Sequence, residues 1–371
     1  MVEMPLDVCI HILDALEETY QGVGLPPQST SESLLACALA CSSWCDHALK
    51  LLYTTIHLRT GTQCRLYLEA LAAHPERAEW AKTLVLCPET YIPLVPLLTP
   101  GFLPRCSYLY IGSSVGSSSL GYPPNYSSGV LQPLLSQHPG LNDVEFALGP
   151  EMPLIRVLSL MRSMPALQAV RLMLPATEAV LQTNLRLKRF VRSNPRIEPT
   201  NVRVLIVRAH DPQLWRNLAH ATAPVITRLE LAWYVQIRAD LDAMFISTSR
   251  MLKSLRRFHR LKHLTLAINL SDIGQYICTR ILSYLPRRFL RELTLDFEMR
   301  SAMRRYRDVT TNRLLEYARI LRKAFQTFLQ DFKCFRLLTL VVPTIPHQTV
   351  REIKEILSPI DCAVSIVIAG K

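Results

Sequence analysis

The chain has 371 residues, of which 49% are hydrophobic and 19% charged, a composition that predicts one long or two ordinary folded domains and excludes a disordered chain. No apolar run approaches the roughly 18 residues that a membrane span needs, and Glu3 and Asp7 stand where a secretory signal would be basic. The net charge is +12, and ten irregularly spaced cysteines favour free thiols, so we expect a cytoplasmic or nuclear protein with no membrane partner.

The first fifty residues predict two or three short apolar helices joined by a polar loop. Met4 and Pro5 open the first helix, where the missing N–H of proline does no harm. The polar stretch QGVGLPPQSTSES then breaks the chain, and Ser31 or Ser33 can cap the next helix. The apolar stripe of the first helix consists of Val8, Ile12, Leu13 and Leu16.

The next predicted helix ends near Trp44, after which HALKLLY leads into the first strand. One face of this helix holds Leu34, Cys37, Ala38, Cys41 and Cys45, with Leu35, Leu39 and Ser42 beside it. The cysteines, with His47 nearby, allow a metal site as an alternative, but C-x3-C-x3-C is not a usual zinc spacing. We therefore expect small buried apolar residues here, and we predict no metal and no cofactor.

This segment resembles the F-box, whose pattern runs roughly L-P-x-E-[VIL], I-L-x-x-L and L-x-x-[CL]-x-L-V-[CS]-x-x-W before an aromatic residue. The matching positions are Met4, Pro5, Asp7, Val8, Ile12, Leu13, Leu16, Leu34, Cys37, Leu39, Cys41, Trp44 and Tyr53. The sequence departs from the pattern at Met4, Asp7 and Ala40 and in a longer insert at residues 17–33.

The resemblance implies that residues 1–53 dock on a Skp-type adaptor and, through it, on a cullin. The implied contact residues are Met4, Pro5, Leu6, Val8, Ile12, Leu13, Leu16, Leu34, Leu39 and Trp44. The physical reason is that short helices expose apolar side chains that a partner can bury, in an interface of about 1,600 Å². The alternative is that the segment only caps the first repeat, as terminal repeat units must.

From residue 53 onward one pattern recurs eleven times: apolar, two variable residues, apolar, one variable residue, apolar. The copies are YTTIHL (53–58), AKTLVL (81–86), CSYLYI (106–111), LNDVEF (141–146), LQAVRL (167–172), VRVLIV (202–207), ITRLEL (226–231), LKHLTL (261–266), LRELTL (290–295), FRLLTL (335–340) and AVSIVI (363–368). The alternation in each copy predicts a strand with one buried face. Stretches with helical spacing lie between the copies, and three of them contain Leu214, Leu218 and Ala221; Ile277, Ile281, Leu282 and Leu285; and Leu314, Leu315, Ala318, Leu321, Phe325 and Phe328.

Strands and helices that alternate in this way predict that residues 54–371 form an α/β solenoid with a curved parallel sheet and outer helices. The pattern resembles leucine-rich repeats, L-x-x-L-x-L, of the irregular kind found in many fungal and other eukaryotic adaptor proteins. It departs from them because the Asn or Cys expected after the last Leu is mostly missing, and the copies lie 24 to 45 residues apart. An ordinary α/β sheet with crossover helices is the alternative, although eleven units exceed what one open sheet usually holds.

Two segments interrupt this rhythm. Residues 112–129 are rich in Gly, Ser and Pro and predict a flexible surface loop. The stretch that begins RSAMRRYR at residue 300 predicts a basic loop followed by an unusually long helix.

The positive charge is concentrated between Arg250 and Lys323, where 18 Lys and Arg outnumber 6 Asp and Glu by the whole net charge of 12. The interpretation we favour for this stretch is a solvated helix face that aids solubility, but arginine binds carboxylate and phosphate in bidentate fashion, so an acidic or phosphorylated target protein is a candidate partner. Nucleic-acid binding is a further alternative that no recognised motif supports. The candidate target-binding residues are Arg256, Arg257, Arg260, Arg287, Arg288, Arg304 and Arg305.

The sequence contains no G-x-S-x-G, P-loop or GxGxxG stretch, and we predict no catalytic residue and no enzymatic activity. The resemblance implies the substrate-recognition subunit of a Skp/cullin/F-box ubiquitin ligase, in which the helices hold the adaptor and the repeats hold a target. The alternatives are a repeat scaffold that binds proteins without a ligase role, and a nucleic-acid-associated protein that uses the basic stretch.

Overall fold

The structure is a computed structural model of the full chain. It describes residues 10–11, 28–40, 42–86, 97, 102–111, 135, 140–147, 154–164, 166–173, 201–209, 212–233, 241–268, 272–297, 307–360 and 362–368. The described residues form an open 11-stranded sheet in which the strands follow one another in sequence order, from β1 to β11. Every strand pair whose register is described is parallel, which confirms the predicted α/β class. The chain divides into two compact units, residues 1–145 and 146–371.

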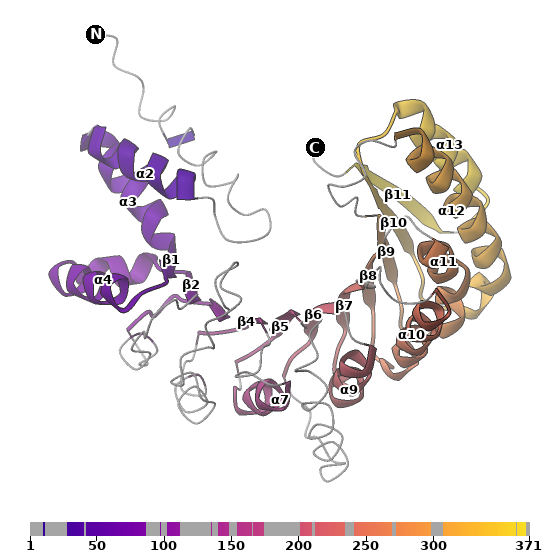
Figure 1. The fold of residues 1–371 in the computed structure, drawn as a ribbon, viewed down its shortest axis with the longest axis horizontal. Coiled ribbons are helices and arrows are strands. Elements are labelled where there is room, and N and C mark those ends of the chain that lie inside the picture. The colour runs from indigo at the N-terminus through magenta and orange to yellow at the C-terminus, as the bar shows by residue number, and fades with distance from the viewer. Residues whose placement is uncertain are drawn as a thin grey trace. The chain divides into compact units, whose positions relative to one another are not determined.

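The first unit begins with helices and continues into parallel strands (Figure 1). Its elements are α2 (Gln28–Ala40), α3 (Ser42–Thr54), β1 (Thr55–Leu58), α4 (Gly61–Ala73), the 3-10 helix η1 (Pro75–Trp80), β2 (Thr83–Leu86), β3 (Tyr108–Ile111) and most of β4 (Asp143–Ala147). Ile56, Leu84 and Leu109 align across β1, β2 and β3, and all three are buried because their side chains share one face of the sheet.

The second unit alternates strands with helices. Its elements are α7 (Leu154–Ser163), β5 (Ala169–Met173), β6 (Val204–Ala209), α9 (Pro212–Thr222), β7 (Arg228–Trp233), α10 (Leu241–Ser254), η3 (Leu255–Arg257), β8 (His263–Ala267), α11 (Asp272–Tyr284), β9 (Glu292–Asp296), α12 (Arg307–Phe328), η5 (Leu329–Asp331), β10 (Leu337–Val342), α13 (His347–Leu357) and β11 (Ala363–Ile368).

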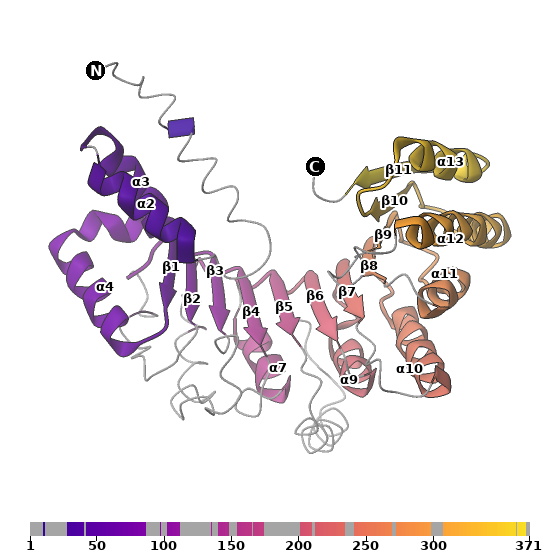
Figure 2. The ribbon, with the colours of Figure 1, turned by 45° about the horizontal axis from the view of Figure 1, so that its top comes forward.

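The core of the second unit is a row of aliphatic side chains that crosses its strands. Val170, Leu205, Leu229, Leu264, Leu293 and Leu338 align in register, and all are buried. Helices α9 to α13 form a layer over one face of these strands, each packed beside the next (Figure 2). The next residues along β8, β9 and β10, which are Thr265, Thr294 and Thr339, align on the opposite face and are only partly buried.

All eleven predicted strands are present, but most begin two residues later than the pattern. In most copies the first apolar residue lies just before the strand, and Leu261 and Leu290 are buried there. The residues that precede the strands also stack, since Lys262 N donates to Thr227 O and Arg291 N donates to Lys262 O, both at 2.8 Å. The parallel ladder therefore extends beyond the strands.

The register of the last strand differs from the one we predicted. We took Ile366 as the equivalent of Leu338, but Leu338 pairs with Val364, and Ile366 pairs with Leu340. The strand starts at Ala363, the first residue of its copy, so this copy of the pattern is shifted by two positions. A shift of two keeps the same side chains on the same face.

The predicted helices are confirmed in the second unit and need correction in the first. Helices α9, α11 and α12 contain the three predicted apolar stripes, and α12 has 22 residues. The single helix predicted over Cys37 and Cys45 is wrong, because α2 ends at Ala40 and α3 begins at Ser42. Helix α3 also includes HALKLLY, which we expected to lead into the strand. The predicted loop at 112–129 lies outside the described residues.

Candidate functional site

Helices α2 and α3 pack against each other through a small apolar cluster. Leu34, Ala38 and Ala48 are buried at its centre. The partly buried side chains around them are Cys37, Trp44, Cys45, Leu49, Leu51 and Leu52. Leu34 is only 2% exposed, so its part in this segment is to hold the two helices together rather than to meet a partner. Cys37 and Cys45 likewise pack against this cluster as small apolar side chains.

The same helix α2 exposes two leucines. Leu39 is 80% exposed and Leu35 is 49% exposed, and their i, i+4 spacing places them on one face of the helix. Single exposed leucines are common on protein surfaces, but two neighbours on a helix whose other face is already packed form an apolar surface that nothing in the described part of the first unit covers. We call Leu35 and Leu39 the α2 leucine pair.

Tyr53, the aromatic position of the F-box-like pattern, joins α3 to the elements that follow it. Its ring lies 6.0 Å from the ring of Tyr67 in α4 and 6.1 Å from that of Trp80 in η1. The guanidinium of Arg77 lies 5.2 Å from the Tyr53 ring, and Arg77 Nη1 donates to Tyr53 Oη at 3.3 Å. These contacts fix the end of α3, so the helix pair continues directly into β1.

The first predicted helix cannot be placed in this way. Its candidate residues lie outside the described part of the chain: Met4, Pro5, Leu6, Val8, Ile12, Leu13 and Leu16. Of the other candidates, Leu34 is buried, Trp44 is partly buried and Leu39 is exposed. Leu35 was not among them, although its spacing from Leu39 could have identified it.

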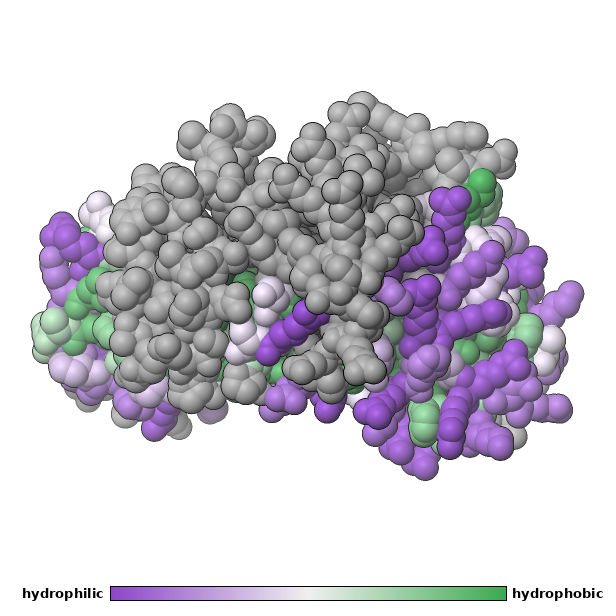
Figure 3. Space-filling model, turned by 90° about the horizontal axis from the view of Figure 1, so that it is seen from below, coloured by the Kyte–Doolittle hydropathy of each residue, from purple (hydrophilic) through white to green (hydrophobic). Residues whose placement is uncertain are grey.

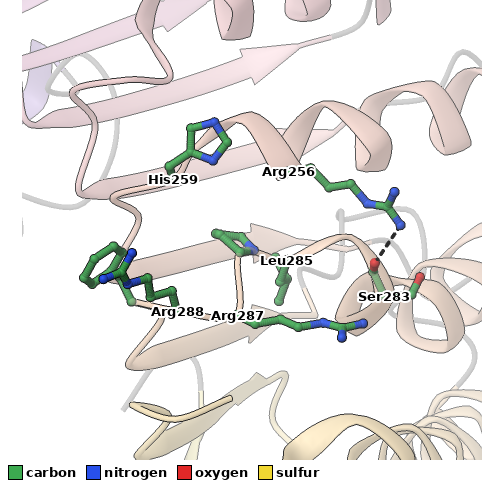
Figure 4. A pocket seen from close by; sticks show the side chains of 8 residues that line it. Arg256, His259, Ser283, Leu285, Arg287 and Arg288 are labelled. Carbon is green, nitrogen blue, oxygen red and sulfur yellow. Dashed lines mark hydrogen bonds between the residues drawn. The ribbon is translucent and has the colours of Figure 1, made fainter. Parts of the chain in front are cut away.

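In the second unit, the predicted basic stretch surrounds an open hollow of about 560 Å³ that we call the Arg256 hollow. Arg256 and His259 approach it from η3 and the turn after it, and Arg287 and Arg288 from the turn after α11 (Figure 4). The remaining lining residues are Ser283, Leu285, Pro286 and Phe289. The hollow therefore combines cationic edges with a partly apolar surface, which suits a polypeptide better than a small ion.

The arginines of the Arg256 hollow already have partners within the chain. Arg256 Nη2 donates to Ser283 O at 3.1 Å, and its guanidinium lies 4.9 Å from the Tyr284 ring. Arg287 forms an ion pair of 2.7 Å with Asp331, and Arg288 lies 5.1 Å from the ring of Phe289. These contacts orient the side chains and partly neutralise their charge.

The other predicted arginines do not all gather at this hollow. Arg260 is exposed in the turn before β8, Arg257 faces a different hollow beside α9, and Arg304 and Arg305 lie outside the described residues. Hydrophilic side chains gather on the right-hand side of the face shown in Figure 3. Arg216, Arg250 and Lys253, which line that second hollow, were not among the candidate residues: Arg250 and Lys253 lie in the predicted basic stretch but were not selected, and Arg216 of α9 lies outside that stretch.

The burial of several described cysteines indicates that their thiols have structural roles. None of the seven described cysteines forms a disulfide bond with another. Burial raises the pKa of the Cys278 thiol to about 12 and that of Cys106 to about 11, so both stay protonated and unreactive at neutral pH. Among the described residues, no three His, Cys, Asp or Glu side chains are placed to hold a metal ion. Within the same residues, no helix has the length and apolar character to cross a membrane.

Comparison with known proteins adds no family assignment. No model of a known protein family matches the chain, and a search of curated proteins found no relative.

Proposed function

We propose that this chain is the substrate-recognition subunit of a Skp/cullin/F-box ubiquitin ligase in the cytoplasm or nucleus. In this role α2, α3 and the segment before them dock on a Skp-type adaptor, and the strand–helix units form an irregular leucine-rich-repeat solenoid that holds a target protein. The chain would catalyse nothing itself. Its contribution would be to raise the effective concentration of a target lysine near the conjugating enzyme.

The observation that carries the proposal is the α2 leucine pair. Leu35 and Leu39 remain exposed although the opposite face of α2 is packed against α3. Burying one leucine side chain contributes about 1.5–3 kcal/mol, so the pair can supply a substantial part of the binding free energy. The direct junction from α3 into β1, fixed by Tyr53, would transmit the position of the adaptor to the repeats.

The test is binding of a purified Skp-type adaptor to the full-length chain. We expect the wild-type chain to bind and the Leu35→Ala, Leu39→Ala double variant to lose at least tenfold in affinity, because both side chains would leave the interface. Leu66→Ala is the matched control, since Leu66 of α4 is 53% exposed and lies outside the helix pair. Absence of binding by the wild-type chain, or equal binding by the double variant, would reject the proposal.

A repeat scaffold without a ligase role is the second candidate function, and the Arg256 hollow favours it independently. Its cationic edge and the exposed ring of Phe289 can receive an acidic polypeptide whether or not an adaptor binds elsewhere. Affinity purification followed by mass spectrometry separates the two candidates. Recovery of acidic partner proteins without any adaptor or cullin would favour the scaffold.

A further inference from the structure

A second hollow, of about 220 Å³, lies beside helices α9 and α10 and differs in character from the Arg256 hollow. The described residues that line it are Arg216 from α9, Arg250, Lys253 and Ser254 from α10, and Arg257 from η3. Four of these five side chains are cationic and none is acidic. We call this the α9–α10 hollow.

The four cations have no carboxylate partner among the described residues. Elsewhere in the described chain, arginines are paired in this way: Arg65 with Glu69, Arg105 with Glu79, Arg228 with Glu230 and Arg287 with Asp331. Like charges held around one small space repel each other, and an anion placed between them relieves that repulsion. Unlike Arg287 of the Arg256 hollow, these four side chains have no carboxylate beside them among the described residues, so an anionic ligand would meet uncompensated positive charge.

The floor of the hollow is rigid. Ser254 is only 4% exposed, and its Oγ donates to Met251 O and accepts from Trp215 Nε1, each at 2.6 Å. The buried Trp215 ring stacks on Phe258, with centroids 5.8 Å apart and planes inclined by 9°. This network holds α9 against α10 and η3, so the backbone positions from which the four cations reach the hollow are fixed.

The pKa of His220 in α9 responds to the positive charges around it. It lies one helical turn after Arg216, and its pKa is lowered first by burial and then by the positive charges of Arg257 and Arg216. Arg216 of α9 and Arg257 of η3 are therefore both close enough to His220 to affect its pKa.

We propose that the α9–α10 hollow binds a phosphate group through Arg216, Arg250, Lys253 and Arg257. One carboxylate cannot neutralise four cations, whereas a phosphate monoester has close to two negative charges and three acceptor oxygens that suit bidentate guanidinium groups. The hollow has room for such a group but not for a folded element. The phosphate can belong to a small molecule or to a phosphorylated side chain, and the site does not depend on adaptor docking.

The experiment is isothermal titration calorimetry on the full-length chain at low ionic strength. One arm uses inorganic pyrophosphate, and the other uses a phosphoserine peptide with its unphosphorylated form as reference. We expect binding by the wild-type chain in at least one arm and at least a tenfold loss in the Arg216→Gln, Arg257→Gln double variant. Binding in the pyrophosphate arm alone indicates a small-molecule phosphate, and tighter binding of the phosphopeptide indicates a phosphorylated protein.

The matched control is the Arg319→Gln, Arg322→Gln double variant, which removes the same charge from exposed positions of α12. It should bind within about twofold of the wild-type chain if the site is specific. Equal losses in both double variants would show general charge attraction and would overturn the proposal. So would the absence of binding in both arms, or unchanged binding by an Arg216→Gln, Arg257→Gln variant whose circular dichroism matches the wild type.

Discussion

His57 shows at the scale of one residue how a strand acts on a titratable side chain. It lies in β1 between the buried Ile56 and Leu58, and its Nε2 is buried without a hydrogen-bond partner among the described residues. Burial, followed by the positive charge of Arg59, lowers the pKa of His57 from 6.5 to about 4. The folded chain therefore keeps this imidazole neutral where the unfolded chain protonates it.

This pKa shift predicts a pH dependence of stability. Because the folded-state pKa is the lower one, the unfolded chain binds more protons between pH 6.5 and 4, and stability falls as the pH falls through that window. We expect the free energy of unfolding of the wild-type chain to fall relative to His57→Gln by up to about 1.4 kcal/mol per pH unit. Urea unfolding of both chains at several pH values measures the difference.

The control for the loss of a histidine is His347→Gln, because His347 is exposed at the start of α13. Its unfolding curve should change with pH as that of the wild-type chain does. A difference between wild type and His57→Gln that stays constant from pH 6.5 to 4.5 would contradict the assignment to His57.

At the scale of elements, α2 is not amphipathic, since both of its faces contain leucine. Leu34 packs into the cluster shared with α3, whereas Leu39 is exposed. Both residues are leucines, and they lie five positions apart. Because only their surroundings differ, Leu34 has a structural role and Leu39 is available for docking.

We expect Leu34→Ala to lower the free energy of unfolding of the helix pair by about 2–5 kcal/mol, because the cluster cannot fill the cavity. Leu39→Ala should change it by less than about 0.5 kcal/mol, because an exposed side chain loses few contacts. Urea unfolding of each variant beside the wild-type chain, followed by circular dichroism, checks both values. Equal effects of the two substitutions would contradict the exposed position of Leu39.

At the scale of the whole molecule, the net charge of +12 creates long-range attraction for any polyanion. Such attraction needs no specific site and is screened by salt. An experiment must therefore distinguish this non-specific attraction from binding at the proposed phosphate site and from sequence-specific binding of nucleic acid.

We expect a single-stranded oligonucleotide to bind the chain at about 20 mM salt and to be released by about 300 mM, without sequence preference, because counterion release alone drives such binding. Fluorescence anisotropy across a salt series with two unrelated sequences makes the measurement. Tight binding that persists at physiological salt and differs between the sequences would instead support a nucleic-acid role.

The eleven strands and three of the outer helices follow from the sequence alone. The apolar pattern repeats along the chain, and parallel strands with one buried face need only local alternation to be recognised. The copies ITRLEL, LKHLTL and LRELTL became β7, β8 and β9 with their central leucines in one buried row. The class of the fold was therefore determined by the sequence.

Only the tertiary structure decided which of the candidate docking and target-binding side chains remain accessible. Pattern placed Leu34 and Leu39 in the same docking set, and only the packing of α3 on α2 separated them. Arg287 and Arg257 belong to one basic stretch, yet Asp331 neutralises the first, while the second joins Arg216 from another helix. The physical reason is that periodicity along a chain reports which face of an element is apolar, whereas exposure and charge pairing depend on neighbours that are distant in sequence.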